Sequence, residues 1–366
     1  MTVRILALVG DCYGARGGIA RYNQDLFESL SAGGAELLVL PRLGDAAGLA
    51  LPEGVRQWRP IFNRAVYSLV SLWVAWCHRP IDVVFCGHVF MAPLAWALAR
   101  LFRARYWLQT HGIDIWTPRS GLQRVAIEGA DLVTAVSRMT RRRLLEWSDL
   151  SPDRVRVLPN TVRDIFAPGP ASPDFRARLD IGGGPVILTV GRLASTERSK
   201  GHEATFTILP ELRRCFPGLV YLIAGEGDDL PRLSARARAQ GLGPEVVRFL
   251  GYVPDDQLPD LYRLADLFVM PSSTEGFGIV YLEAAACGLR VVGGTSDGSV
   301  DAIQDPRVGA TVNPEDRDAL LAAVVSGLQA ERVDPALIEP YRRPHFSRVA
   351  RAFLAELVGR IPKARR

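Results

Sequence analysis

The chain has 366 residues, 48% of them hydrophobic and 23% charged, with a formal net charge of +5 at pH 7. This length exceeds what one hydrophobic core usually supports, so two globular domains are expected rather than a disordered or fibrous protein. No apolar run reaches 18 residues, so we expect no transmembrane helix. The five cysteines lack metal-ligand or C-x-x-C spacing, which indicates reduced thiols in a cytosolic protein.

The charge is concentrated in the first part of the chain. Residues 1–165 contain 20 basic and 14 acidic side chains, whereas the remainder contains 24 basic and 25 acidic ones. A basic first half favours an anionic or membrane-surface acceptor on that half, although solvated arginines without a function explain it equally well. Of the 44 basic residues, only Lys200 and Lys363 are lysine. This suggests a need for a compact ammonium group at Lys200, although chance placement is the simpler explanation of a single lysine.

Apolar segments typical of buried strands alternate with helical patterns along the whole chain. The first segment reads as a strand because it lacks the length and cleavage site of a signal peptide. The expected strands are Val3–Val9, Leu37–Leu40, Val83–Cys86, Tyr106–Thr110, Leu132–Val136, Val155–Leu158, Val186–Val190, Val220–Ala224, Val246–Leu250, Leu267–Met270 and Arg290–Val292. Continuous apolar strands separated by helices predict parallel sheets covered on both faces. The pattern occurs twice, so the fold class is α/β with two doubly wound, Rossmann-like domains.

The richest Pro/Gly segment, residues 165–173, marks the domain boundary. We therefore expect one domain over residues 1–165 and a second over 174–340. A C-terminal helix in residues 341–366 is expected to pack back toward the first domain. Ligands of open α/β sheets bind beyond the carboxyl ends of the strands, so the cleft between two such domains is the expected site.

Three features of the first half follow predicted strands. Gly17 and Gly18 precede a helix, where they would let the backbone approach a phosphate, although the G-x-G-x-x-G pattern of dinucleotide folds is absent. His111, in a loop beside a glycine, can hydrogen-bond a sugar hydroxyl, and a structural role is the alternative. His88 has a similar position with less support.

The segment Ala65–Cys77 contains no charge and includes three aromatic residues, Tyr67, Trp73 and Trp76. A tryptophan-bearing helix near arginines can lie on a membrane surface. A core helix of the first domain is the more common explanation for such a pattern.

In the second half, Arg192 and Lys200 lie in a loop after a strand and would supply two cations for a diphosphate. A surface pair between Arg192 and Glu197 is the alternative. Asp316 and Asp318 have the D-x-D spacing of a metal site, but the preceding Pro-Glu indicates a helix start with acids that favour the helix dipole. We therefore expect no metal ion.

The segment from Pro271 to Gly288 is the most informative part of the chain. Glu283 is the only charged residue in the apolar stretch between Gly276 and Gly288, which predicts a buried helix whose carboxylate needs specific partners. Glu275 lies eight residues earlier and is followed by Gly276, Phe277, Gly278 and Ile279, a turn that exposes N–H groups at a helix start. Two carboxylates around an anion-binding turn suggest a nucleotide sugar.

Taken in order, these motifs resemble the retaining glycosyltransferases of the family-4 type, which have the GT-B fold of two Rossmann-like domains facing a central cleft. The match runs from about residue 9 to 312 and rests on Gly17-Gly18, His111-Gly112, Gly191-Arg-Leu193, Lys200-Gly201 and Glu275-x7-Glu283. Two positions depart from the family pattern. The family usually has a glutamate four residues after its second Gly-Gly begins, where this chain has Asp297, and Arg163 stands where many relatives carry an acid.

The resemblance implies metal-independent transfer of a hexose from a UDP- or GDP-linked sugar to a glycan or lipid-linked acceptor, in polysaccharide or cell-envelope synthesis. It implies that residues 1–165 form the acceptor-side domain and residues 174–340 the nucleotide-sugar donor domain. It implies no cofactor, no nucleic-acid partner, and a cytoplasmic protein that can contact the membrane peripherally through its basic N-terminal domain. The catalytic set is His111, Arg192, Lys200 and Glu275. The donor-binding set is Gly17, Gly18, Arg192, Lys200, Glu275, Gly276, Phe277, Gly278, Ile279 and Glu283. A sugar-nucleotide epimerase, a phosphorylase and a non-catalytic binding subunit remain as alternatives.

Overall fold

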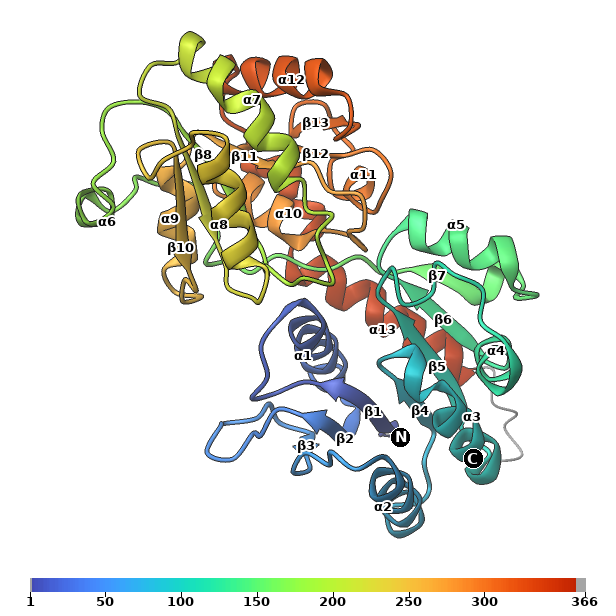
Figure 1. Cartoon of the computed structure of the whole chain (residues 1–366). Coiled ribbons are helices and arrows are strands. Elements are labelled where there is room, and N and C mark those ends of the chain that lie inside the picture. Colours follow the sequence, from blue (N-terminus) through green and yellow to red (C-terminus); the bar gives the residue numbers. More distant parts are fainter. Residues whose placement is uncertain (1, 360–366) are drawn as a thin grey trace. The chain divides into compact units, whose positions relative to one another are not determined.

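The computed structural model describes residues 2–359 of the chain (Figure 1). Close contacts divide these residues into two compact units. The first unit contains the residues up to Thr161 together with those from Arg343 onward, and the second contains Val162–Arg342. Each unit is built around its own parallel sheet, as the alternation of apolar strands and helices predicts.

The first unit has a seven-stranded sheet with the order β3-β2-β1-β4-β5-β6-β7, and all its neighbouring strands are parallel. Its strands are β1 (Arg4–Asp11), β2 (Glu36–Leu43), β3 (Val55–Gln57), β4 (Val83–Cys86), β5 (Arg105–Thr110), β6 (Leu132–Ala135) and β7 (Val155–Val157). The strand order reverses between β1 and β4. The loops after these two strands therefore flank the switch point, where open sheets bind ligands.

Helices cover both faces of this sheet. They are α1 (Gly18–Ser31), α2 (Arg64–Cys77), η1 (Val89–Met91), α3 (Ala92–Phe102), α4 (Gly121–Glu128), α5 (Arg138–Trp147), η2 (Pro152–Arg154) and α13 (Arg343–Gly359). The last of these, α13, packs against α1. Arg343 lies 2.6 Å from the Asp25 carboxylate, and the Ser347 hydroxyl lies 2.7 Å from that of Ser29. The remainder of the predicted C-terminal segment, residues 360–366, lies outside the described residues.

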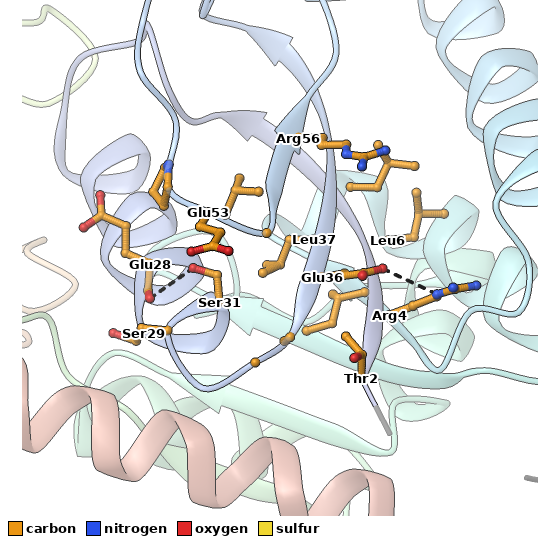
Figure 2. A pocket seen from close by; sticks show the side chains of 18 of the residues that line it. Thr2, Arg4, Leu6, Glu28, Ser29, Ser31, Glu36, Leu37, Glu53 and Arg56 are labelled. Carbon is orange, nitrogen blue, oxygen red and sulfur yellow. Dashed lines mark hydrogen bonds and ion pairs between the residues drawn. The ribbon is translucent and has the colours of Figure 1, made fainter.

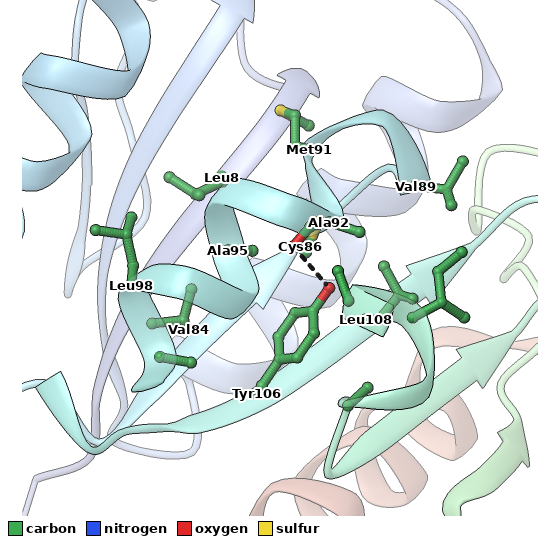
Figure 3. Close-up of a cluster of buried hydrophobic side chains, with 14 of the residues drawn as sticks. Leu8, Val84, Cys86, Val89, Met91, Ala92, Ala95, Leu98, Tyr106 and Leu108 are labelled. Carbon is green, nitrogen blue, oxygen red and sulfur yellow. Dashed lines mark hydrogen bonds between the residues drawn. The ribbon is translucent and has the colours of Figure 1, made fainter. Parts of the chain in front are cut away.

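Strand alternation decides which side chains meet which helices. Val84 and Cys86 of β4 belong to a core cluster with α3, in which the Tyr106 hydroxyl points toward Cys86 (Figure 3). Phe85, between them, points to the opposite face, where its ring lies 5.4 Å from that of Phe27 in α1. The central strand is therefore buried on both faces, which explains its continuous apolar sequence.

The second unit has a six-stranded parallel sheet with the order β10-β9-β8-β11-β12-β13. Its strands are β8 (Val186–Val190), β9 (Val220–Ala224), β10 (Val247–Gly251), β11 (Leu267–Met270), β12 (Arg290–Gly294) and β13 (Gly309–Val312). Its helices are α6 (Pro173–Arg178), α7 (His202–Cys215), α8 (Leu230–Ala239), α9 (Leu258–Leu264), α10 (Ile279–Ala286), α11 (Ser299–Ala302), α12 (Arg317–Gln329) and η3 (Pro335–Tyr341). The order again reverses, here between β8 and β11.

The predicted α/β fold class is confirmed, and every expected strand is present to within a few residues. Two short strands, β3 and β13, were not predicted from the sequence; both lie at the edge of their sheet. No helix within residues 2–359 combines the length and the apolar character needed to cross a membrane. The five cysteines are all free thiols.

Candidate functional site

The loop between β8 and α7 brings Lys200 to the carboxyl edge of the second sheet. Gly201 is the N-cap of α7 and has a left-handed backbone, φ +80°; a side chain there would collide with the carbonyl oxygen of Pro271. The N–H of Ser273 donates to the carbonyl oxygen of Ser199 at 2.9 Å. Because the two loops are joined this closely, Lys200 is held next to the segment that carries Glu275.

Lys200 and Glu275 form a close ion pair. The Lys200 Nζ lies 2.5 Å from Glu275 Oε1 and 4.0 Å from Glu197 Oε2. Burial alone would lower the pKa of Lys200, but the charge and the hydrogen bond of Glu275 outweigh it and raise this pKa above its usual value. Lys200 therefore keeps its positive charge at neutral pH. The fold brings together two residues that are 75 positions apart in the sequence.

Arg192 lies in the same loop but differs from Lys200 in its environment. Its side chain is 70% exposed and is paired with Glu197. This pair is the alternative that the sequence left open, and a solvated pair of this kind contributes little to stability. Arg192 is thus a solvent-exposed cation, and Glu197 pairs with both Arg192 and Lys200.

The backbone of Glu275 is fixed by Asp297, which follows β12. Asp297 Oδ2 accepts hydrogen bonds from the N–H of Glu275 (2.7 Å) and the hydroxyl of Ser272 (2.6 Å). Its other oxygen accepts from the N–H of Ser299 at 2.9 Å, and the N–H of Gly298 donates to the Glu275 carbonyl oxygen at 2.7 Å. Asp297 is completely buried. It was missed as a site residue, since its loop signalled only a departure from the family pattern.

The predicted turn before the buried helix is present. Gly278 caps α10 in the left-handed conformation, φ +82°, and a side chain there would strike the Tyr281 ring. Phe277 is buried, and Ile279 is the first residue of the helix. The N–H of Tyr281 donates to the carbonyl oxygen of Gly278 at 3.1 Å. The first backbone N–H groups of a helix point out of its amino end, which gives such a turn its capacity for anions.

Glu283 lies on α10 and is only 7% exposed, as the apolar surroundings in the sequence predict. Its Oε2 accepts a hydrogen bond from the Tyr262 hydroxyl at 3.0 Å. A carboxylate can accept several hydrogen bonds at once. Lys200, Glu275 and the Gly278 turn lie at the carboxyl side of the second sheet, and Glu283 lies in the helix that begins there.

In the first unit, His111 directly follows β5. Its Nε2 lies 2.9 Å from the carbonyl oxygen of Gly87, so Nε2 must carry the proton. Burial, with a smaller contribution from His88, lowers the pKa of His111 to about 3. The ring is therefore neutral at physiological pH, and it packs edge-on against Tyr22 of α1 at 5.4 Å. In this state His111 can hydrogen-bond a hydroxyl but carries no charge.

The loop of His111 is closed by Asp114, for which the sequence suggested no role. The N–H of His111 lies 3.1 Å from Asp114 Oδ1. Burial raises the pKa of Asp114 to about 7, although hydrogen bonds from the N–H groups of His111 and Gly112 act in the opposite direction. Asp114 thus orients the loop in the first unit as Asp297 does in the second.

The other predicted residues of the first unit, Gly17, Gly18 and His88, lie at the starts of helices. Gly17 is the N-cap of α1 and Gly18 its first residue, as expected, and both are exposed. His88 accepts a hydrogen bond from the N–H of Phe90 at 3.3 Å, and its ring stacks on the Phe90 ring. This arrangement gives His88 a structural role at the start of η1.

A cavity of about 1490 Å³ lies elsewhere in the first unit. Figure 2 shows that it is lined at the amino ends of β1–β3, where Arg4, Glu36, Glu53 and Arg56 contribute side chains. Because open α/β sheets bind ligands beyond the opposite ends of their strands, we do not place the site in this cavity.

Asp316 caps α12 by accepting from the N–H of Ala319 at 2.9 Å, as its sequence context predicts. Residues 2–359 contain no group of three or more His, Cys, Asp or Glu side chains placed to bind a metal.

Comparison with protein-family models matches both halves of the chain. Residues 16–164 match the model described as Glycosyltransferase Family 4, and residues 184–330 match Glycosyl transferases group 1. A GDP-mannose-dependent α-(1-6)-phosphatidylinositol monomannoside mannosyltransferase of Mycolicibacterium smegmatis is 36% identical over 258 residues, covering 67% of this chain and 66% of the relative. The protein of the same name from Mycobacterium tuberculosis is 30% identical over 343 residues, covering 88% of each.

Solved structures show the same fold. A glycosyltransferase from Rickettsia africae superposes with a TM-score of 0.78 at 17% identity, covering 98% of this chain and 99% of its own. Anabaena HepE in complex with UDP-glucose superposes with a TM-score of 0.73 at 19% identity, covering 96% of this chain and 99% of the HepE chain. The chain therefore belongs to the family 4, group 1 glycosyltransferases: it has the GT-B fold and is a hexosyltransferase that acts on nucleotide sugars.

Proposed function

We propose that this enzyme transfers mannose from GDP-mannose to a lipid-linked acceptor, with retention of the anomeric configuration and without a metal ion. The proposed donor and acceptor rest on the similarity to two mannosyltransferases, whose names specify GDP-mannose and a phosphatidylinositol mannoside. The observation that supports metal independence is the buried Lys200–Glu275 pair beside the helix start at Gly278. A cation and N–H groups replace the charge that a metal would supply.

The reaction breaks the bond between the anomeric carbon and the diphosphate oxygen, so negative charge develops on the diphosphate. Lys200, the exposed Arg192 and the N–H groups of the α10 turn stabilise that charge. The acceptor hydroxyl forms the new bond on the same face of the sugar and gives its proton to the departing phosphate oxygen. We assign no protein nucleophile to this step.

The two glutamates bind the ends of the donor. Glu283, buried and already hydrogen-bonded by Tyr262, accepts from the ribose hydroxyls. Glu275 uses one oxygen to hold Lys200 and offers the other to the hydroxyls of the hexose. His111, neutral and donating from Nε2 to Gly87, leaves Nδ1 to accept from a hydroxyl of the sugar. Each contact is a hydrogen bond to a fixed group, which orients the donor before reaction.

We further propose that the enzyme is cytoplasmic and works at the inner face of the cell membrane in cell-envelope synthesis. The names of both mannosyltransferase relatives specify an acceptor that is a glycolipid. Such an acceptor is presented at a membrane surface.

A thermal-shift comparison of GDP, UDP and ADP tests the donor assignment. A ligand that binds only the folded protein raises its melting temperature, and the expected order is a large shift with GDP and GDP-mannose and small shifts with the others. A larger shift with UDP and UDP-glucose would contradict the assignment. The coupling constant of the anomeric proton in the product, measured by NMR, tests retention.

A further inference from the structure

Helix α2 exposes a second apolar stripe that the fold does not cover. Its inward residues, Tyr67, Ser71, Val74 and Ala75, are buried in the first unit. The opposite side carries apolar residues spaced three and four apart, which places them in one line along the helix: Val66, Leu69, Trp73 and Trp76. Of these, Leu69 is 69% exposed, Trp73 55% and Trp76 57%.

The apolar surface extends beyond the helix stripe. Phe62, just before α2, and Leu72 are also exposed. The Trp73 ring packs edge-on against Trp58, 5.6 Å between centroids, so it is held in place rather than freely rotating. Scattered exposed apolar residues are ordinary, but a continuous surface of aromatic and aliphatic groups marks an interaction site. We call Phe62, Val66, Leu69, Leu72, Trp73 and Trp76 the α2 surface.

The charged residues of the chain segment that carries the α2 surface are all basic. No acidic residue occurs between Glu53 and Asp82, whereas Arg59, Arg64 and Arg79 in this segment are all exposed. The Arg79 guanidinium lies 3.9 Å above the centroid of the Trp76 ring. An arginine above a tryptophan at the edge of an apolar face provides a cation at the depth of lipid headgroups while the ring enters the acyl region.

From this combination we infer that the α2 surface docks on a bilayer that contains anionic phospholipids. A lipid surface offers apolar chains to the tryptophans and phosphates to the arginines at the same time. A second copy of the chain on this face would bring like-charged arginines together, which is unfavourable. The inference deepens the proposed work at the membrane and rests on that part of the proposed function, but docking itself requires neither the proposed donor nor the proposed acceptor.

Sedimentation of the full-length protein with vesicles tests the inference. The wild type is expected to pellet with an equal mixture of phosphatidylcholine and phosphatidylglycerol and to remain in solution with phosphatidylcholine alone. The triple variant Leu69→Ser/Trp73→Ser/Trp76→Ser is expected to lose binding by more than tenfold. Leu122→Ser/Val125→Ser, which removes two exposed apolar residues of α4, is the matched control and should bind like the wild type.

A second variant tests the charge. Arg64→Gln/Arg79→Gln is expected to weaken binding by about fivefold for each arginine, since each basic residue near an anionic surface contributes about 1 kcal/mol. Added salt should weaken wild-type binding in the same direction. Binding of the triple variant equal to wild type, or equal wild-type binding to neutral vesicles, would overturn the inference. So would wild-type self-association that the triple variant abolishes, because the surface would then belong to a second copy of the chain.

Discussion

Lys200 is the residue on which the proposed chemistry depends most. It is the only lysine between residues 2 and 359, and its ammonium is paired with Glu275 at 2.5 Å. Lys200→Ala should reduce turnover by about 100-fold, comparable to the loss of one oxyanion donor. Steady-state kinetics with an established donor measure this effect. Wild-type turnover in the variant would remove Lys200 from the mechanism, and Lys200→Arg distinguishes the charge from its compact shape.

Asp297 acts on the reaction through Glu275, so it is a positioning residue. Asp297→Ala leaves the N–H groups of Glu275 and Ser299 and the Ser272 hydroxyl without their acceptor in a buried place. We expect kcat to fall by roughly tenfold or more as Glu275 loses its orientation, with partial recovery in Asp297→Asn.

Asp316→Ala is the matched control for this variant. It also removes a carboxylate that accepts from a backbone N–H, at the start of α12, and should lower stability by about 1 kcal/mol without changing kcat. A parallel fall of kcat in both variants at a temperature well below unfolding would show that Asp297 contributes stability alone.

Helix α10 is buried and contains Glu283, as its apolar sequence predicts. Its residues Tyr281–Ala286 are all buried, as an all-apolar helix requires, and Glu283 is among them. Glu283→Gln keeps the shape and an acceptor for Tyr262 but removes the charge. GDP affinity should weaken by about tenfold, since hydrogen bonds to a charged group contribute about 1.5–3 kcal/mol.

Calorimetric titration with GDP measures the effect of Glu283→Gln, and inorganic pyrophosphate serves as the control ligand because it has no ribose. Pyrophosphate affinity should stay at the wild-type value. Unchanged GDP affinity would show that Glu283 does not bind the ribose.

At the scale of elements, the sequence predicted what depends on local pattern. Continuous apolar runs identified the strands, and glycines identified the turn at Gly278. The edge strands β3 and β13 were missed because each is short and has a single buried residue. Which apolar face of α2 is covered could not be predicted, since periodicity finds apolar stripes but not their partners. The contacts of Lys200 and Asp297 were also out of reach, because they join segments 75 and 22 residues apart.

Global unfolding is expected to depend on pH through His202, which is buried at the start of α7. Burial, with a smaller contribution from Lys200, lowers the pKa of His202 to about 4. In the unfolded chain His202 takes up a proton below about pH 6.5, whereas in the folded chain it stays neutral at that pH. The contribution of His202 to the free energy of unfolding is therefore fully present above about pH 6.5 and is lost as the pH falls. At pH 5 the loss amounts to about 2 kcal/mol.

Denaturant unfolding of wild type and His202→Gln at pH 7 and pH 5 measures this contribution as a difference between the two proteins. The stability advantage of the wild type should shrink at pH 5. An advantage that is the same at both pH values would contradict the assigned pKa. The comparison must be made between variants, because Asp114, with its raised pKa, gains stability over the same range as the pH falls.

For the whole molecule, the central claim is that the chain transfers mannose from GDP-mannose to a lipid-linked acceptor. The most direct measurement is the release of GDP from GDP-mannose, with and without a phosphatidylinositol mannoside acceptor in vesicles. We predict release only when the acceptor is present, far slower release of UDP from UDP-glucose, and about 100-fold slower release by Lys200→Ala. Equal release without acceptor, or faster release from UDP-glucose, would contradict the proposed function.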